Sequence, residues 1–350
     1  MKKYLLFSFA VLSIFACNPE PSDPIDKTDY TDVLNNLTEQ VIIPTYDDLY
    51  QKTNSLVNTL NTLQSNPSSA NLDAARQAWR DARIPWEQSE GFLYGPVETL
   101  GIDPSIDSWP VNQEDLDAVL ASSDVLTKSY LDAQVCTIKG FHTLEYLLFG
   151  ANANKQIGDF SARQFEYLSA AGQSLQGACQ TLRDNWTGGV TNFGHTFQTA
   201  GNSGNVAYPS QKSALQEIVN GCITIADEVA NGKIYAPFSE EDLRLEESRF
   251  SANSKADFAD NIRSIKNIYT GLYANASGKG LSSVISEKNA TLDSKVRQEI
   301  EDAIAAINAI EGTFTSAIFN AKASVTNAQN KVHNLQVTLQ SEVYPVIDGL

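Results

Sequence analysis

The sequence has little histidine, cysteine, methionine or positive charge. Its 350 residues include three histidines, four cysteines and one methionine. Lysine and arginine together number 25 against 42 aspartates and glutamates, which gives a formal net charge of −17 at pH 7. A chain with this excess of negative charge is repelled by nucleic-acid phosphates and by anionic lipid headgroups. We therefore exclude a nucleic acid as a partner.

The cysteines are too few for a disulfide scaffold, and they are too widely spaced for a zinc knuckle, which needs closely spaced pairs. They stand at positions 17, 136, 179 and 222. Outside the cytoplasm, two of the three cysteines Cys136, Cys179 and Cys222 can form one disulfide, and the spacing favours no particular pairing.

The N-terminal apolar stretch, from Leu5 to Ala16, is too short to span a membrane. It follows Lys2 and Lys3, and this order predicts a secretion signal over residues 1–17. Ile14-Phe15-Ala16-Cys17 resembles the lipobox of bacterial lipoproteins, with Phe15 where a small residue is usual. The resemblance implies a lipid on Cys17 that holds the protein to a membrane of the cell envelope. The alternative is ordinary secretion. Residues 18–29 are polar and proline-containing and predict a flexible tether.

Helical periodicity dominates the rest of the chain. Between residues 300 and 339, apolar side chains follow one another at steps of three, four or seven, which places them on one helix face. We expect a further helix over 72–94 and a loop over 103–115. The pattern gives about eight helices, twice the number in a single four-helix bundle. We therefore expect an all-α protein of two packed four-helix bundles, residues 30–187 and 208–350.

His142 and Glu145 lie three residues apart in an apolar run, Gly140 to Gly150. On a helix this spacing places both side chains on one face. A buried imidazole and a buried carboxylate are costly unless they pair with each other, bind a metal or take part in chemistry. The two interpretations that remain are a His–Glu hydrogen bond in a core and a functional site.

A second group of residues strengthens the functional interpretation. Trp79, Arg83, Trp86 and Glu90 are spaced to line one helix face, and two tryptophans mark that face as buried. Pro85 lies within the same segment and bends a helix. Arg83 and Glu90 therefore point inward, either as a structural ion pair or as part of a site.

A metal needs more ligands than His142 and Glu145 supply. Glu90 is a natural third ligand, and Asp103 or Asp107 can supply a fourth. One imidazole with three carboxylates suits iron, manganese or zinc. Glu145 or Glu90 could also act as a general base.

Four ordered blocks resemble the imelysin family. Gly140 to Glu145 resembles its Gly-x-His-x-x-Glu signature, and the other blocks are Trp79–Pro96, Ile106–Pro110 and Glu247–Ser251. The resemblance implies two related helical bundles in an exported bacterial protein. It also implies a site formed by His142, Glu145, Glu90 and Asp107, with Arg83 and Ser251 lining the same pocket.

The family is classed with the metallopeptidases, and related proteins act in iron uptake or lie at the cell surface. The resemblance therefore implies an envelope lipoprotein that binds a divalent or ferric metal, iron or zinc above all, in metal acquisition. Its partners would be the membrane and metal-uptake or surface proteins. A metallopeptidase is the first alternative, although the sequence has no zinc-protease ligand set. A haem- or peptide-binding protein is the second.

Overall fold

The computed structural model describes residues 29–188, 192–274 and 278–350, and it is helical, with no strand in these ranges. The all-α prediction is confirmed. The predicted signal, the Cys17 lipid site and nearly all of the predicted tether lie outside the described residues. Within the described ranges, no helix combines the length and the apolar character that crossing a bilayer demands.

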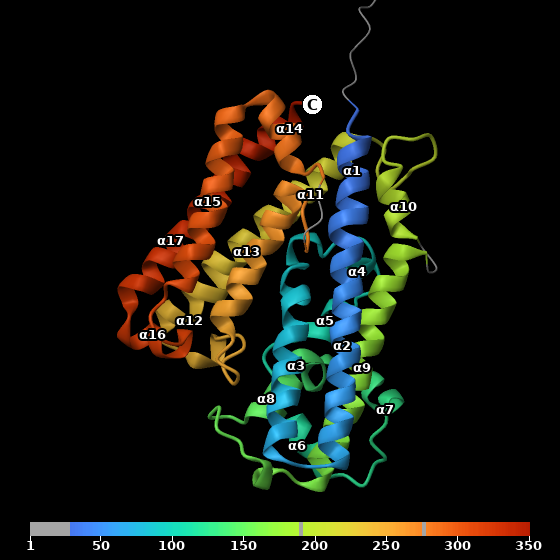
Figure 1. Ribbon diagram of the computed structural model, residues 1–350, viewed down its shortest axis with the longest axis vertical. Helices are drawn as coiled ribbons and strands as arrows, with labels where there is room; N and C mark the ends of the chain where they lie inside the picture. Colours follow the sequence, from blue (N-terminus) through green and yellow to red (C-terminus); the bar gives the residue numbers. More distant parts are fainter. Residues whose placement is uncertain (1–28, 189–191, 275–277) are drawn as a thin grey trace, which may run out of the picture.

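The first group of helices is built around α2 (Ile43–Ser65). This long helix packs along both α3 (Ser69–Glu87) and α9 (Ala162–Thr187), and α8 (Gly140–Phe149) packs on α3 and α9. These helices lie together on the right of Figure 1. Their buried faces form one side of the core.

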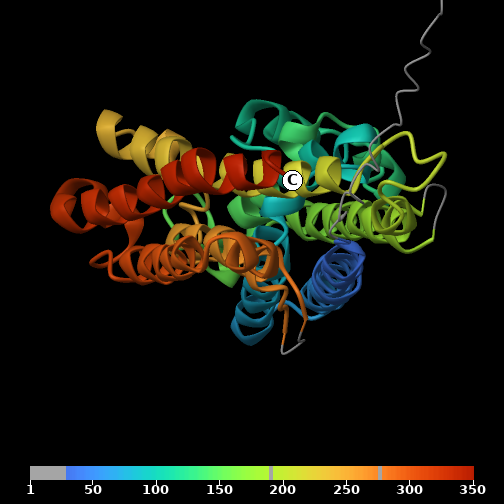
Figure 2. The ribbon, with the colours of Figure 1, turned by 90° about the horizontal axis from the view of Figure 1, so that it is seen from above.

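The second group consists of α11 (Gln211–Asp227), α13 (Ser254–Thr270), α15 (Ala290–Asn308) and α17 (Lys322–Thr338). Helix α15 packs on α13 and α17, and α11 packs on the same two helices. The two groups lie side by side in both views (Figures 1 and 2). The predicted boundary between residues 187 and 208 stays a prediction.

Shorter helices connect and cover these two groups. They are α1 (Thr31–Leu37), α4 (Pro96–Thr99), α5 (Asp103–Asp107), α6 (Gln113–Ala121), α7 (Lys128–Asp132), α10 (Phe193–Gln198), α12 (Tyr235–Glu240), α14 (Leu281–Lys288), α16 (Phe314–Asn320) and α18 (Tyr344–Asp348). Three π-helical turns cover Thr38–Ile42, Glu228–Ile234 and Leu339–Val343. Single 3-10 turns cover Glu90–Phe92, Cys136–Ile138, Ile157–Asp159 and Leu243–Leu245.

Helix α3 is shorter than the sequence predicts. It starts at an N-cap, where the Ser68 hydroxyl accepts a hydrogen bond from the backbone N–H of Asn71, and it ends at Glu87 rather than near residue 94. Pro85 has no N–H for the carbonyl of Asp81, and the chain leaves the helix two residues later. Glu90 therefore opens a separate 3-10 turn and does not share a helix face with Arg83.

The predicted loop over 103–115 is also corrected, because it contains the single-turn helix α5 and the start of α6. Pro104 stands in the first turn of α5, where its missing N–H costs no hydrogen bond. This short helix packs on α8 and α9 and so fixes the position of Asp107 at its C-terminal end.

The disulfide that the sequence leaves possible is not formed, because Cys136, Cys179 and Cys222 are free thiols. Cys179 and Cys222 are buried in helices of different groups, α9 and α11. Burial raises the pKa of the Cys222 thiol to about 12, so this sulfur stays protonated and acts as a small apolar side chain.

The two groups meet through polar contacts between the end of α3 and α13. The Gln88 side-chain amide donates to Asp260 at 2.7 Å and accepts from Asn267 at 3.0 Å. The backbone N–H of Gly91 donates to the Ser264 hydroxyl at 2.7 Å. These pairs orient the C-terminal half of α3, and with it Arg83, toward the second group.

Gly140 is required at the start of α8. Its φ is +81°, a conformation that side chains with a Cβ rarely adopt, and a Cβ there would overlap the backbone carbonyl of Ile106. Gly140→Ala is therefore expected to lower the free energy of unfolding by about 1–3 kcal/mol. Gly158→Ala is the matched control, because nothing lies within 4 Å of its added Cβ. Equal denaturant midpoints for the two variants would contradict this account.

Candidate functional site

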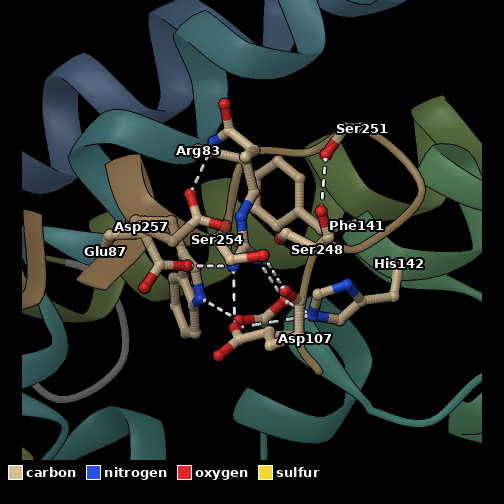
Figure 3. Close-up of polar contacts among 12 residues, drawn as sticks. Arg83, Glu87, Asp107, Phe141, His142, Ser248, Ser251, Ser254 and Asp257 are labelled. Atoms are coloured by element: carbon tan, nitrogen blue, oxygen red, sulfur yellow. Dashed lines mark hydrogen bonds and ion pairs between the residues drawn. The ribbon is translucent and has the colours of Figure 1, made fainter. Parts of the chain in front are cut away.

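Arg83 is the centre of the site. Its side chain is fully buried, and its guanidinium forms ion pairs with Glu87 from its own helix and with Asp107 from α5. The same guanidinium also reaches the second group of helices and the segment that precedes α13. Its Nη2 lies 2.9 Å from an oxygen of Glu247 and 3.3 Å from an oxygen of Asp257. Figure 3 shows these carboxylates converging on the one guanidinium. Arg83 therefore joins acids of both groups of helices.

His142 lies beside the same carboxylates and is also fully buried. Its Nδ1 is 3.2 Å from Oε2 of Glu145, as the i, i+3 spacing predicts. Its Nε2 points the other way, 3.1 Å from Oδ1 of Asp107 and 3.6 Å from Oε1 of Glu247. That nitrogen makes no hydrogen bond of normal geometry with a described group, although both acids lie within ion-pair distance. Nε2 is thus a buried nitrogen, unpartnered in the sense of hydrogen-bond geometry, that faces two carboxylates.

Glu145 is held by hydrogen bonds on both of its oxygens. Oε1 accepts from the backbone N–H of Ser251 at 2.8 Å and from its hydroxyl at 2.7 Å, and Oε2 contacts His142. These bonds join α8 to the segment Glu246–Ser251, which precedes α13. A histidine whose second nitrogen is fixed by a carboxylate has a defined tautomer and ring orientation. Glu145 thus orients His142.

Tryptophans enclose the polar cluster. The indole N–H of Trp86 donates to Oδ2 of Asp107 at 2.6 Å. The Trp109 ring meets the His142 ring edge-on, with 4.9 Å between their centres. The two indoles restrict water and lower the local dielectric, which strengthens every charge interaction inside the cluster.

The segment that supplies Glu247 has an irregular backbone. Ser248 and Ala252 adopt positive φ angles of 54° and 56° although neither is glycine. The hydroxyl of Ser251 also donates to the carbonyl of Ser248 at 3.1 Å, which ties the segment to itself. Non-glycine residues in this conformation cluster at functional sites, where the surrounding contacts hold them in place.

The charges at the site move the pKa values in opposite directions. Burial raises the pKa of Asp107, but Arg83 and His142 outweigh burial and lower that pKa to about 2. Burial lowers the pKa of His142, and the charge of Asp107 raises it well above its usual range. For Asp257, burial outweighs the attraction of Arg83 and raises the pKa to about 6. Burial also raises the pKa of Glu87 well above its usual range. The site therefore holds more acidic groups than its cations can keep ionised.

Lys233 is the second fixed cation. It lies on the π-helical turn Glu228–Ile234, and its Nζ is 3.0 Å from Oε2 of Glu247 and 3.8 Å from Oε2 of Glu87. Glu247 is therefore held from two sides, since Lys233 contacts Oε2 and Arg83 contacts Oε1. These contacts lower the pKa of Glu247 well below its usual range despite its burial.

A cavity of about 380 Å³ lies next to the cluster. Glu90, Asp103 and Asp107 line it together with acids of the second bundle. Burial and the neighbouring carboxylates Asp107 and Glu228 raise the pKa of Asp103 to about 6. Asp107 belongs both to the cavity wall and to the Arg83 cluster, so the two are continuous.

The structure brings five of the sequence-predicted residues into direct contact, namely Arg83, Asp107, His142, Glu145 and Ser251. Glu90 does not pair with Arg83, which contacts Glu87 instead, so the alternative of an Arg83–Glu90 ion pair is wrong. Glu90 and Asp103 lie on the cavity wall. Because the predicted helix was extended past Pro85, Glu90 was given the place that Glu87 occupies.

Sequence reasoning missed four residues of the cluster: Glu87, Lys233, Glu247 and Asp257. Glu87 could have been found, since it follows Arg83 at i, i+4 on a helix. Glu247 and Asp257 belong to a polar segment that the sequence marks as unusual but does not connect to Arg83. No sequence pattern pointed to Lys233, because a π-helical turn shifts the helix face on which the following side chains lie.

Three sets of described side chains offer ligand atoms that lie within 4.8 Å of one another. The first is Asp107, His142 and Glu247, the second is Glu87, Glu90 and Asp107, and the third is Glu87, Glu247 and Asp257. Only the first contains the unpartnered nitrogen of His142. A donor set of one imidazole and two carboxylates suits iron, manganese or zinc. Of the three sets, Asp107, His142 and Glu247 best fit a metal ion.

Fold and site together define an all-helical protein that buries an acid–histidine–arginine cluster between two groups of helices. The imelysin family model matches residues 42–339, so the chain belongs to the imelysin family. The chain is 28% identical over 317 residues to iron-regulated protein A from Synechococcus elongatus, covering 90% of this chain and 86% of that protein.

Solved structures agree with this assignment. A protein from Parabacteroides distasonis, described as an iron-regulated protein A precursor, superposes with a TM-score of 0.81 at 26% identity, covering 91% of this chain and 94% of that one. An imelysin-like protein from Psychrobacter arcticum has a TM-score of 0.74 at 16% identity, covering 90% and 94%. At that identity the second likeness shows the fold alone.

Glu246, next to Glu247, provides a test of the buried charge. Its Oε1 accepts hydrogen bonds from Ser254 and Thr315, both at 2.8 Å, and burial raises its pKa to about 7. An acid whose pKa is raised on folding destabilises the protein increasingly as pH rises from about 4.5 to about 7. Relative to the parent protein, Glu246→Gln is expected to gain about 2 kcal/mol of unfolding free energy between pH 5 and pH 8.

Urea unfolding of the parent and of Glu246→Gln at several pH values measures this gain. Glu311→Gln, an exposed glutamate to glutamine change, is the control and should leave the pH dependence unchanged. If the difference in unfolding free energy between Glu246→Gln and the parent stays constant from pH 5 to pH 8, the raised pKa of Glu246 is contradicted.

Proposed function

We propose that this imelysin-family protein binds a divalent or ferric metal ion at the cluster between the bundles, as a lipid-anchored envelope protein in iron or other metal acquisition. The observation that carries the proposal is the unpartnered, buried Nε2 of His142, which faces Asp107 and Glu247. The names of two relatives, iron-regulated protein A and its precursor, make iron the first metal to test.

His142, Asp107 and Glu247 would hold the metal. Glu145 fixes His142 so that Nε2 is the nitrogen turned toward the carboxylates. Lys233 contacts Oε2 of Glu247, while Oε1 contacts Arg83 at 2.9 Å and faces His142 at 3.6 Å. A bound ion would add positive charge where buried carboxyl groups exceed the fixed cations, and this excess favours cation binding.

The contacts of Glu145 argue against this residue as the general base of a metallopeptidase; Glu90, the other candidate base, lies on the cavity wall. A general base for a metallopeptidase needs a carboxylate free to take a proton from water. Both oxygens of Glu145 are already engaged, by Ser251 and by His142. The same contacts suit a residue that orients a ligand.

His142→Ala tests the proposed ligand. We expect the parent protein, dialysed against chelator and then buffer, to bind Fe(II) under anaerobic conditions, or Zn(II), saturably in calorimetry. We expect His142→Ala to bind at least about tenfold more weakly, because it loses a nitrogen ligand. His333→Ala, which changes an exposed histidine, should bind like the parent. Lack of saturable binding by the parent, or equal affinity in the two variants, would overturn the proposal.

Glu145→Gln tests the orienting role. The glutamine can still accept from Ser251, but its amide would then donate to Nδ1 of His142. The imidazole proton would shift to Nε2 and block coordination there. We expect a loss of metal affinity of about 10–100-fold with an unchanged circular dichroism spectrum. Parent-like affinity would show that Glu145 does not set the tautomer.

A further inference from the structure

Acids make up half of the residues that line the cavity beside the cluster. Glu90, Asp103, Asp107, Glu228 and Glu247 contribute five carboxyl groups to its wall, and Lys233 contributes one ammonium group. The wall is formed by the 3-10 turn Glu90–Phe92 and α5 on one side and by the π-helical turn Glu228–Ile234 on the other. Even with some of these acids protonated, the wall attracts cations and repels anions.

This cavity leads to the proposed ligands. Asp107 and Glu247 line the cavity, and the unpartnered Nε2 of fully buried His142 lies 3.1 Å and 3.6 Å from their oxygens. Glu228 at the other side is exposed, and its carboxylate is 3.9 Å from Lys233. A cation entering from solvent therefore meets carboxylates before it reaches His142.

The cavity is much larger than a bare ion. Its volume of about 380 Å³ is more than ten times the roughly 30 Å³ that one water occupies in the liquid. An ion that keeps a shell of waters fits such a space, and carboxylates at the wall can accept hydrogen bonds from that shell.

We propose that the acidic cavity receives the metal as a hydrated cation and excludes metal carried by an anionic chelate. The inference rests on the proposed function, because it names the form of the metal that this same site takes. Binding in the cavity is through the water shell, and coordination by His142, Asp107 and Glu247 follows once waters leave.

Two substitution-inert cobalt complexes separate charge from coordination. Hexaamminecobalt(III) imitates a hydrated cation, because its ammine ligands donate hydrogen bonds and do not exchange. The cobalt(III) complex of EDTA is an anion of chelated metal. We would measure the binding of each by equilibrium dialysis in 150 mM NaCl. We expect saturable binding of hexaamminecobalt(III) to the full chain and no saturable binding of the EDTA complex.

The double variant Asp103→Asn, Glu228→Gln removes two cavity charges and conserves side-chain size. We expect it to bind hexaamminecobalt(III) at least fivefold more weakly. The double variant Glu114→Gln, Glu311→Gln removes two exposed charges outside the cavity wall and should change binding less than twofold. The melting temperatures of both double variants would be measured to check that they fold.

Zn(II) calorimetry on the same samples separates the two proposals. Saturable Zn(II) binding without saturable hexaamminecobalt(III) binding would overturn this inference alone. Equal affinity of the protein for the two cobalt complexes would also overturn this inference alone. An equal loss of hexaamminecobalt(III) affinity in the two double variants would do the same. Failure of Zn(II), anaerobic Fe(II) and hexaamminecobalt(III) to bind would overturn this inference and the proposed function together. Hexaamminecobalt(III) binding without binding of Zn(II) or Fe(II) would support the cavity and overturn the proposed function.

Discussion

The buried guanidinium of Arg83 is the interaction on which the arrangement of the site depends. It contacts Glu87 and Asp107 from the first group of helices and Glu247 and Asp257 from the second. A charge in this position is stable only while its partners stay in place, since an unpaired buried charge costs several kcal/mol. The two groups of helices are therefore held in one relative position where their acids meet.

The same cluster explains why the site is suited to a cation. Arg83 and Lys233 keep Glu247 ionised, yet burial leaves Glu87 and Asp257 with raised pKa values. A cluster with more carboxyl groups than fixed cations can hold protons or, in their place, a metal ion. Structural ion pairing and cation binding are thus two consequences of one charge distribution, and the acidic cavity beside it extends that distribution toward solvent.

Prediction from sequence succeeded where a single regular helix decided the geometry. His142 and Glu145 lie on one short helix, and their contact follows from the i, i+3 spacing. It failed for Glu90, because Pro85 ends regular helix soon afterwards and the periodic rule no longer applies. The family resemblance, more than periodicity, placed Asp107 at the site, because the short helix that carries it has too few residues for a periodic pattern.

The helical class of the chain, the imelysin resemblance and the pairing of His142 with Glu145 could be predicted from the residues alone, since each depends on residues close together in the chain. The packed structure established which acids surround Arg83. Glu247 is 164 residues away from it, and contacts over such separations depend on how helices pack, which local spacing does not encode. The π-helical turn that brings Lys233 to Glu247 was likewise set by packing, because it departs from the regular period on which sequence patterns rely.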